Sequence, residues 1–315
     1  MRVLVFGAGV IGTVYAWQLS LAGHDVTVLV RPGRAQALKT AGVRITGVDQ
    51  RRRAHVRIDA TYHPHVVEDF SAADGYEFLL VCVRHNQWPE VLPFLAARLG
   101  SADVLFFGNI WTGDEEIRRH LPLGRYLFGF PSGGGGWSNG ALEVGLGART
   151  RLGELNGERT PRLMRIDQAL RDAGFRPELC DRILHWLWVH YATIAGLLCG
   201  IAKAGSARAY AASAPIVRES FLAAREGLDV CRARGVQLRG LPATRSLRLP
   251  LSLVVPVARR AYRNPLFETM MDGHLAHAHD EMFKVYHDVV DTGARLGVPM
   301  PALLGFGPYI ERRLA

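Results

Sequence analysis

The chain has 315 residues, of which 49% are hydrophobic and 21% charged, and this composition excludes disordered, collagen-like and low-complexity proteins. The net charge is +9, but the basic residues are scattered among acidic ones, which disfavours nucleic acid as a partner. Only three of the 38 basic residues are lysines, and arginine binds phosphate and carboxylate groups in a bidentate manner. The arginine excess is therefore compatible with small anionic ligands.

The most apolar stretch runs from Ile183 to Ala202 and carries two histidines and several small residues. This pattern is typical of a buried helix, and we expect neither a membrane span nor a membrane partner. The four cysteines are far apart, and no leader precedes the first strand-like run. We therefore predict a cytoplasmic protein with reduced thiols.

The first thirty residues predict a βαβ unit that binds a dinucleotide. A strand at 2–6 leads into the turn Gly7-Ala8-Gly9-Val10-Ile11-Gly12, which is followed by a helix at 13–22 and a strand at 26–30. Gly7 permits the tight turn, Gly9 lets the backbone approach a pyrophosphate, and Gly12 lets helix and strand pack closely. Val10 and Ile11 place the first amides of the helix beside the phosphates.

The residue at the end of the second strand indicates which dinucleotide is bound. An NAD site usually has Asp or Glu there, whereas this chain has Arg31 and then Arg34, with no acid nearby in the sequence. A guanidinium suits the 2′-phosphate of NADPH, although a solvated loop arginine would have the same sequence. We favour NADPH as the cofactor.

The remaining elements predict two domains. Further strands at 43–45, 78–83 and 104–107, with helices at 35–40 and 89–99, favour a parallel sheet covered on both faces. The glycine-rich segment 129–153 is typical of a flexible loop or of a functional one. A helix at 161–173 and a junction at 174–177 follow, and long helices are expected around 179–203, 215–234 and 265–296. We therefore predict a Rossmann-type α/β NADPH-binding domain over 1–176 and an all-α substrate and dimerisation domain over 177–315.

Several segments resemble the ketopantoate reductase (2-dehydropantoate 2-reductase) family of pantothenate biosynthesis. They are the N-terminal turn, the segments 83–87, 106–117 and 129–157, Leu187-Trp188-Val189-His190 and the closing run 296–301. The resemblance implies a Rossmann-type domain, a helical domain, and a cleft between them in which NADPH reduces a 2-keto acid.

The resemblance also suggests residue roles, some with departures from the family pattern. Arg84 stands at the position of a family lysine, Gln87 matches a glutamine, and Asn109 matches an asparagine whose following glycine is Ile110 here; all three are expected at the cofactor. His190 replaces the lysine that donates the proton, and Ile194 and Leu198 replace two asparagines. Glu268, or alternatively Asp272, matches a late glutamate.

These departures leave the chemistry open within one class. Reduction of a carbonyl needs a proton donor and stabilisation of the developing alkoxide. The catalytic candidates are His190 as the general acid, Glu268 to orient the substrate or His190, and Asn109. The competing interpretations are that His190 is a core histidine whose hydrogen bonds are satisfied and that Glu268 is a solvated surface glutamate.

The preferred function is an NADPH-dependent reductase of a small anionic or carbonyl substrate, most simply 2-dehydropantoate, which is reduced to pantoate. Alternatives are a ketone or imine reductase of specialised metabolism and an inactive NADPH-sensing protein. A metal site at His274, His277 and His279 is disfavoured because the spacing matches no zinc signature. The exact substrate, the physiological direction and whether the protein is a homodimer are left open by the sequence.

Overall fold

The computed structural model describes residues 1–51, 55–241 and 243–311, and the chain divides into two compact units, Met1–Leu184 and His185–Ala315. The sequence placed the boundary between residues 176 and 177. The structural division falls later because Arg176–Leu179 forms a strand, β12, that pairs in parallel with strand β11 (Arg149–Gly153) of the first unit.

The first unit is built on an eight-stranded sheet. Its other strands are β1 (Arg2–Phe6), β2 (Asp25–Leu29), β5 (His65–Val67), β6 (Phe78–Val81), β7 (Asp103–Phe107) and β8 (Tyr126–Phe130). The strand order is β12-β11-β8-β7-β6-β1-β2-β5, and every neighbouring pair is parallel except β11 and β8. The predicted α/β class with a mostly parallel sheet is confirmed.

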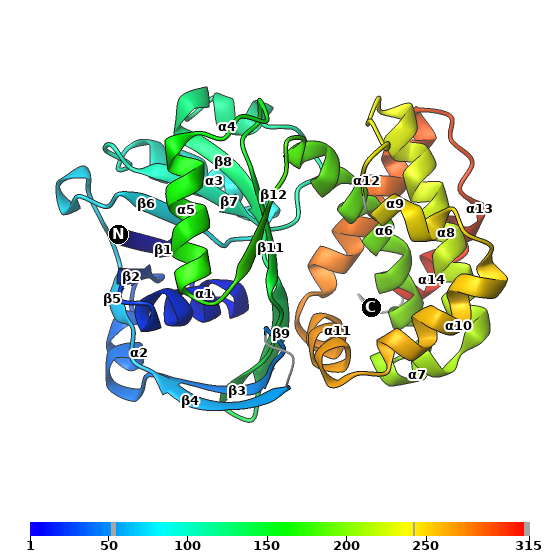
Figure 1. Ribbon diagram of the computed structural model, residues 1–315, viewed down its shortest axis with the longest axis horizontal. Helices are drawn as coiled ribbons and strands as arrows, with labels where there is room; N and C mark the ends of the chain where they lie inside the picture. Colours follow the sequence, from blue (N-terminus) through cyan, green and yellow to red (C-terminus); the bar gives the residue numbers. More distant parts are fainter. Residues whose placement is uncertain (52–54, 242, 312–315) are drawn as a thin grey trace. The chain divides into compact units, whose positions relative to one another are not determined.

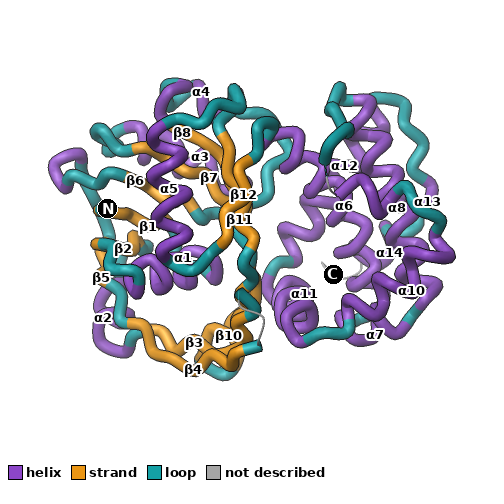
Figure 2. The backbone as a smooth tube through the Cα atoms, viewed as in Figure 1, coloured by secondary structure: helices purple, strands orange, loops and turns teal. Residues whose placement is uncertain are grey.

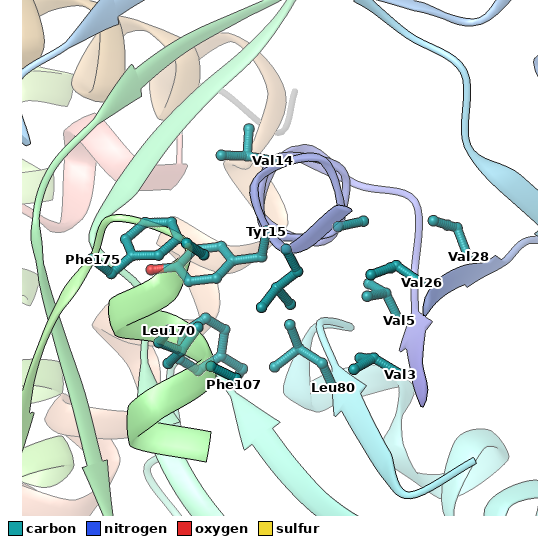
Figure 3. Close-up of a cluster of buried hydrophobic side chains, with 14 of the residues drawn as sticks. Val3, Val5, Val14, Tyr15, Val26, Val28, Leu80, Phe107, Leu170 and Phe175 are labelled. Carbon is teal, nitrogen blue, oxygen red and sulfur yellow. The ribbon is translucent and has the colours of Figure 1, made fainter. Parts of the chain in front are cut away.

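Helices cover both faces of this sheet, as the near-continuous apolar strands predict. The helices of the unit are α1 (Val10–Leu21), α2 (Ala35–Ala41), α3 (Trp88–Ala96), α4 (Glu115–Arg118) and α5 (Pro161–Asp172). Val3 and Val5 of β1 point to the core under α1 and α5, where Tyr15 stacks on Phe175 with ring centroids 4.4 Å apart (Figure 3). Phe6 points to the opposite face and meets Phe94 of α3.

A second, four-stranded sheet adds to the same unit. Its strands are β3 (Val43–Asp49), β4 (Val56–Tyr62), β9 (Gly133–Ser138) and β10 (Ala141–Leu146), in the order β4-β3-β10-β9. Figure 2 shows β3, β4 and β10 close together below the main sheet. Of the two interpretations of segment 129–153, the flexible loop is therefore wrong. Gly135 has φ +150°, and a Cβ there would lie 1.9 Å from the carbonyl oxygen of Glu143, so glycine is what lets β9 approach β10.

The described part of the second unit is helical throughout (Figure 1). Its helices are α6 (Ile183–Ala204), which begins in the first unit, α7 (Ala207–Ala212), α8 (Ala214–Ala233), α9 (Ala243–Leu247), α10 (Leu251–Tyr262), α11 (Pro265–His277), α12 (His279–Arg295), α13 (Pro301–Leu304) and α14 (Gly307–Glu311). The predicted stretch 265–296 is divided at Ala278, whose φ of −129° is not helical.

Helix α6 has the length and hydropathy of a membrane span, but 56% of its most apolar window is buried, as in the core helix of a globular domain. Its small residues allow close packing against α8. A Cβ on Gly196 would lie 2.6 Å from the carbonyl oxygen of Ser220, and one on Gly227 would lie 2.5 Å from that of Ala192. The stripe of small residues in the sequence is explained by this helix–helix contact.

Candidate cofactor site and candidate catalytic residues

The strand order places a switch point beside β1. From β1 the chain crosses through α1 to β2 on one side, and β6 later pairs with the other side of β1. Open α/β sheets bind ligands outside the carboxyl ends of their strands at such a point. Here those ends carry Gly7 after β1 and Arg84 shortly after β6, while Arg31 follows β2 on the far side of β1.

The glycine turn is shaped for close backbone approach. Gly7 has φ +109°, in the region that favours glycine, and a Cβ on Gly12 would lie 1.9 Å from the carbonyl oxygen of Gly7. Gly9 precedes α1 and differs from both, because a Cβ there would meet no heavy atom within 4 Å. The turn therefore leaves open space in front of Gly9, where a phosphate could approach the backbone.

The first turn of α1 offers its amides to an anion. No acidic residue lies in that turn, and no side chain accepts a hydrogen bond at its N-cap, Gly9. The first amides of a helix have no partner within the helix, and the helix dipole adds a partial positive charge there. The residues present therefore fit a pyrophosphate at this position.

A cavity of about 830 Å³ opens at the switch point. All the residues that line it belong to the first unit. Of the residues predicted to bind cofactor, it is lined by Gly7, Gly9, Arg31, Arg84 and Gln87, together with Arg34. Val10, Ile11, Gly12 and Asn109 do not line it; the first three lie in α1, and Asn109 follows β7, the neighbour of β6.

Arg84 and Gln87 belong to one structured turn. The amide of Arg84 donates a hydrogen bond to Oε1 of Gln87 across 3.2 Å, at the start of a 3-10 turn over His85–Gln87. The His85 ring in turn contacts the Trp88 ring edge-on, with centroids 4.5 Å apart. The side chain of Gln87 therefore holds the backbone that carries Arg84, in addition to lining the cavity.

The structure places an acid that sequence reasoning missed beside the two arginines. Glu68 follows β5 and lines the cavity together with Arg31 and Arg34. Its Oε1 accepts a hydrogen bond from the amide of Ala35 across 2.8 Å. The expectation that no acid lies near Arg31 holds along the chain but is wrong in space, because β5 pairs with β2.

Aromatic and apolar side chains of the second sheet complete the cavity. Trp137 of β9 and Tyr62 of β4 line it, together with Leu38, Val43 and Pro64. Trp137 is 45% exposed, which is unusual for so large an apolar side chain. A planar group such as adenine suits these surroundings, and the only sequence signal was an aromatic residue directly after four glycines.

In the second unit His190 is a partly buried side chain of α6. Its ring stacks on Trp186, with centroids 5.2 Å apart and the planes 7° apart. Burial, together with the nearby His274, lowers the pKa of His190 to about 4. The imidazole is therefore neutral near pH 7, which differs from the ordinary titration expected from the sequence.

Next to His190 on the same helix, Tyr191 belongs to a charged network. Its hydroxyl donates a hydrogen bond to Oδ2 of Asp288 across 2.6 Å, and Lys284 lies 2.9 Å from the same carboxylate. Burial, and then the Asp288 charge, raise the pKa of Tyr191. The tyrosine therefore stays protonated at neutral pH.

The two late carboxylates have local partners. Glu268, in the first turn of α11, pairs with Arg208 across 3.1 Å. Asp272 accepts a hydrogen bond from the amide of Ala207, across 2.7 Å, at the start of α7. Asp272 therefore ties α11 to α7, while Glu268 is held by an ion pair with a largely exposed arginine.

Neither metal chelation nor disulfide bonding is indicated in the described ranges. No group of three His, Cys, Asp or Glu side chains there could hold a metal ion, and Nδ1 of His274 lies 3.0 Å from the carbonyl oxygen of Met270. All four cysteines are free thiols. Burial raises the pKa of Cys82, so this thiol at the cavity is protonated.

Comparisons with known proteins agree with this architecture. The family model "Ketopantoate reductase PanE/ApbA" matches residues 3–157. A 2-dehydropantoate 2-reductase of Mesorhizobium japonicum is 26% identical over 213 residues, covering 60% of this chain and 63% of that protein. The chain thus spans about three fifths of the length of the curated relatives it matches.

Solved structures extend the likeness in fold to the whole chain. A PanE/ApbA family ketopantoate reductase from Ralstonia eutropha JMP134 superposes with a TM-score of 0.72 at 21% identity, covering 99% of this chain and 98% of that one. A D-mandelate dehydrogenase solved with NADH and anilino(oxo)acetate gives a TM-score of 0.73 at 14% identity, with the same coverage. At these identities the similarity concerns the fold.

Proposed function

Because the chain belongs to the ketopantoate reductase family, we propose that it is an NADPH-dependent reductase of a small carbonyl compound, with the 2-keto acid 2-dehydropantoate as its substrate. The observation that carries the proposal is the cavity at the switch point, in which a glycine turn and the start of α1 lie between Arg31 and Arg84. Bound NADPH would supply the hydride that attacks the carbonyl carbon.

The chain's own residues hold this cofactor in a defined order. The amides at the start of α1 and the open space at Gly9 receive the pyrophosphate. Arg31 and Arg34 pair with the 2′-phosphate, since guanidinium binds phosphate through paired hydrogen bonds. Arg84, Gln87 and Asn109 follow strands on the other side of β1, and we assign them to the nicotinamide half.

We assign the proton to His190. A ketone that accepts a hydride becomes an alkoxide, which must gain one proton to give the alcohol. With a pKa of about 4, His190 is a neutral imidazole near pH 7. Its N–H would donate a hydrogen bond to the developing alkoxide and pass it the proton, and the imidazolate left behind would take a proton back from water, so that one proton is consumed per alcohol formed. We assign Glu268 to orienting the substrate.

We also propose that the protein is cytoplasmic, with which its free thiols agree.

The test is a panel of 2-keto acids, other ketones and cyclic imines, assayed by the loss of reduced-nicotinamide absorbance. Turnover of 2-dehydropantoate above the other compounds supports the proposed substrate. If only another ketone or an imine is turned over, the assignment as a reductase stands and the assignment of 2-dehydropantoate as its substrate fails. A sensor is the second candidate, because a histidine with a pKa of about 4 is almost never an imidazolium at neutral pH and is therefore a poor proton donor. Tight NADPH binding without turnover of any compound would establish the sensor.

A further inference from the structure

Glu68 brings a fixed negative charge into the part of the cavity that carries Arg31 and Arg34. It comes from a different strand than the arginines. Strand β5 pairs in parallel with β2, and the amide of Val30 donates to the carbonyl oxygen of Val67 across 2.9 Å. Glu68 and Arg31 therefore leave adjacent strands at the same level.

Backbone amides hold this carboxylate in place. The amide of Ala35 donates to Oε1 across 2.8 Å. This bond, with smaller contributions from the neighbouring amides of Gly33 and Arg34, lowers the pKa of Glu68, so the side chain is ionised at neutral pH. The loop between β2 and α2 is thus tied to β5 by a charged group.

The arginines are not neutralised by this acid. Within the described ranges no ion pair of 4 Å or less joins Glu68 to Arg31 or Arg34, and both arginines are exposed. A carboxylate has about four lone-pair sites, so the bond from the amide of Ala35 leaves capacity for a further donor. The cavity therefore offers guanidinium donors and a carboxylate acceptor in the same region.

We propose that Glu68 determines the selectivity between NADPH and NADH, a role that rests on the proposed function and refines its cofactor. The 2′-phosphate of NADPH is attracted by the two arginines and repelled by Glu68. The ribose 2′-hydroxyl of NADH is instead a donor that the carboxylate accepts, as Asp or Glu does at the end of the second strand in NAD sites. The native protein accordingly binds both cofactors, with a modest preference for NADPH.

The test compares dissociation constants of NADPH and NADH for the native protein and Glu68→Gln, by titration of cofactor fluorescence without substrate. Glutamine keeps an oxygen for the amide of Ala35 and removes the charge, so the loop stays tied. We expect the preference for NADPH to rise on the order of tenfold, through tighter NADPH and weaker NADH binding. A rise in salt should shrink the difference between native protein and variant, since exposed charges are screened.

The matched control is Asp69→Asn, which removes the same charge one residue away. Asp69 pairs with Arg98 across 2.8 Å and does not line the cavity, so its variant should keep the native preference. An unchanged or lower preference for NADPH in Glu68→Gln would overturn the proposal. An equal loss of affinity for both cofactors would also overturn it, because Glu68 would then only stabilise the loop between β2 and α2. If the native protein binds neither cofactor, it is the proposed function that fails.

Discussion

A Cβ on Gly12 would lie 1.9 Å from the carbonyl oxygen of Gly7, although the two residues are separated by the whole glycine turn. The carbonyl is backbone and cannot swing aside, so the start of α1 would have to move away from β1. Gly9 lies between them, and a Cβ there meets nothing within 4 Å. Gly12 is thus required for the packing of α1 against β1. Gly9 is required for the open space through which a phosphate would approach the backbone.

Alanine at these two positions should separate stability from binding. We expect Gly12→Ala to lower the free energy of unfolding by about 1–3 kcal/mol or more, as overpacking does, and to weaken cofactor binding with it. Gly9→Ala should keep the native unfolding midpoint in urea but lose cofactor affinity, because its Cβ occupies the open space. Equal stability losses in both variants would contradict this division.

The arginines after β2 should act on one cofactor only. Arg31→Ala and Arg34→Ala each remove a charged donor from the cavity, and a hydrogen bond to a charged group contributes about 1.5–3 kcal/mol. We expect NADPH to bind about 10–100-fold more weakly and NADH to bind almost as before. Arg44→Ala, on β3 and outside the cavity, is the control. Native NADPH affinity in both cavity variants would remove the 2′-phosphate assignment.

The sequence predicted the parallel sheet because its strands and glycine turn are local signals. The strand predicted at 43–45 was wrongly assigned to that sheet, since β3 belongs to the second sheet. The other strands of the second sheet were missed for a physical reason. Strand β9 is mostly glycine and has no side-chain alternation, and its pairing with β10 depends on backbone contact at Gly135. Likewise β12 is short, contains Pro177, and is an edge strand whose pairing partner is β11.

The cofactor site was predicted in the same uneven way. Gly7, Gly9 and Arg31 follow one another around a single βαβ unit, so their spacing along the chain indicates their position. Glu68 and Trp137 enter the cavity from β5 and from the second sheet. No spacing along the chain predicts contacts of this kind, because they depend on which strands pair.

Trp137 should report cofactor binding directly. Its ring lines the cavity and is 45% exposed, so a stacked adenine would cover it and quench its fluorescence. We expect Trp137→Ala to weaken both NADPH and NADH by about tenfold, since stacking of a base on an aromatic ring contributes about 1–3 kcal/mol. Trp137→Phe should retain most of the affinity while losing the quenching. Undiminished quenching in that variant would exclude contact with this tryptophan.

His190 should affect turnover and not cofactor binding. We expect His190→Ala to lower kcat by about 10²–10⁴-fold, the range for loss of a general acid, with the NADPH dissociation constant unchanged. His190→Lys places an ammonium donor at the same position of α6 and should recover part of kcat. Native kcat in His190→Ala would show that the histidine only fills the interior.

The titration of His190 should also be visible in stability. Its pKa is about 4 in the folded chain and near the ordinary 6.5 in the unfolded chain. Between these values the unfolded chain binds more protons, so the free energy of unfolding should fall as the pH drops from 6.5 towards 4, by up to about 3 kcal/mol. Above pH 6.5 this contribution is constant.

His190→Gln should flatten the slope of the unfolding free energy against pH, as measured by urea unfolding. His24, whose pKa burial also lowers, contributes separately, so His24→Gln should leave the His190 share in place. A slope that His190→Gln does not change would place the native pKa of His190 near 6.5.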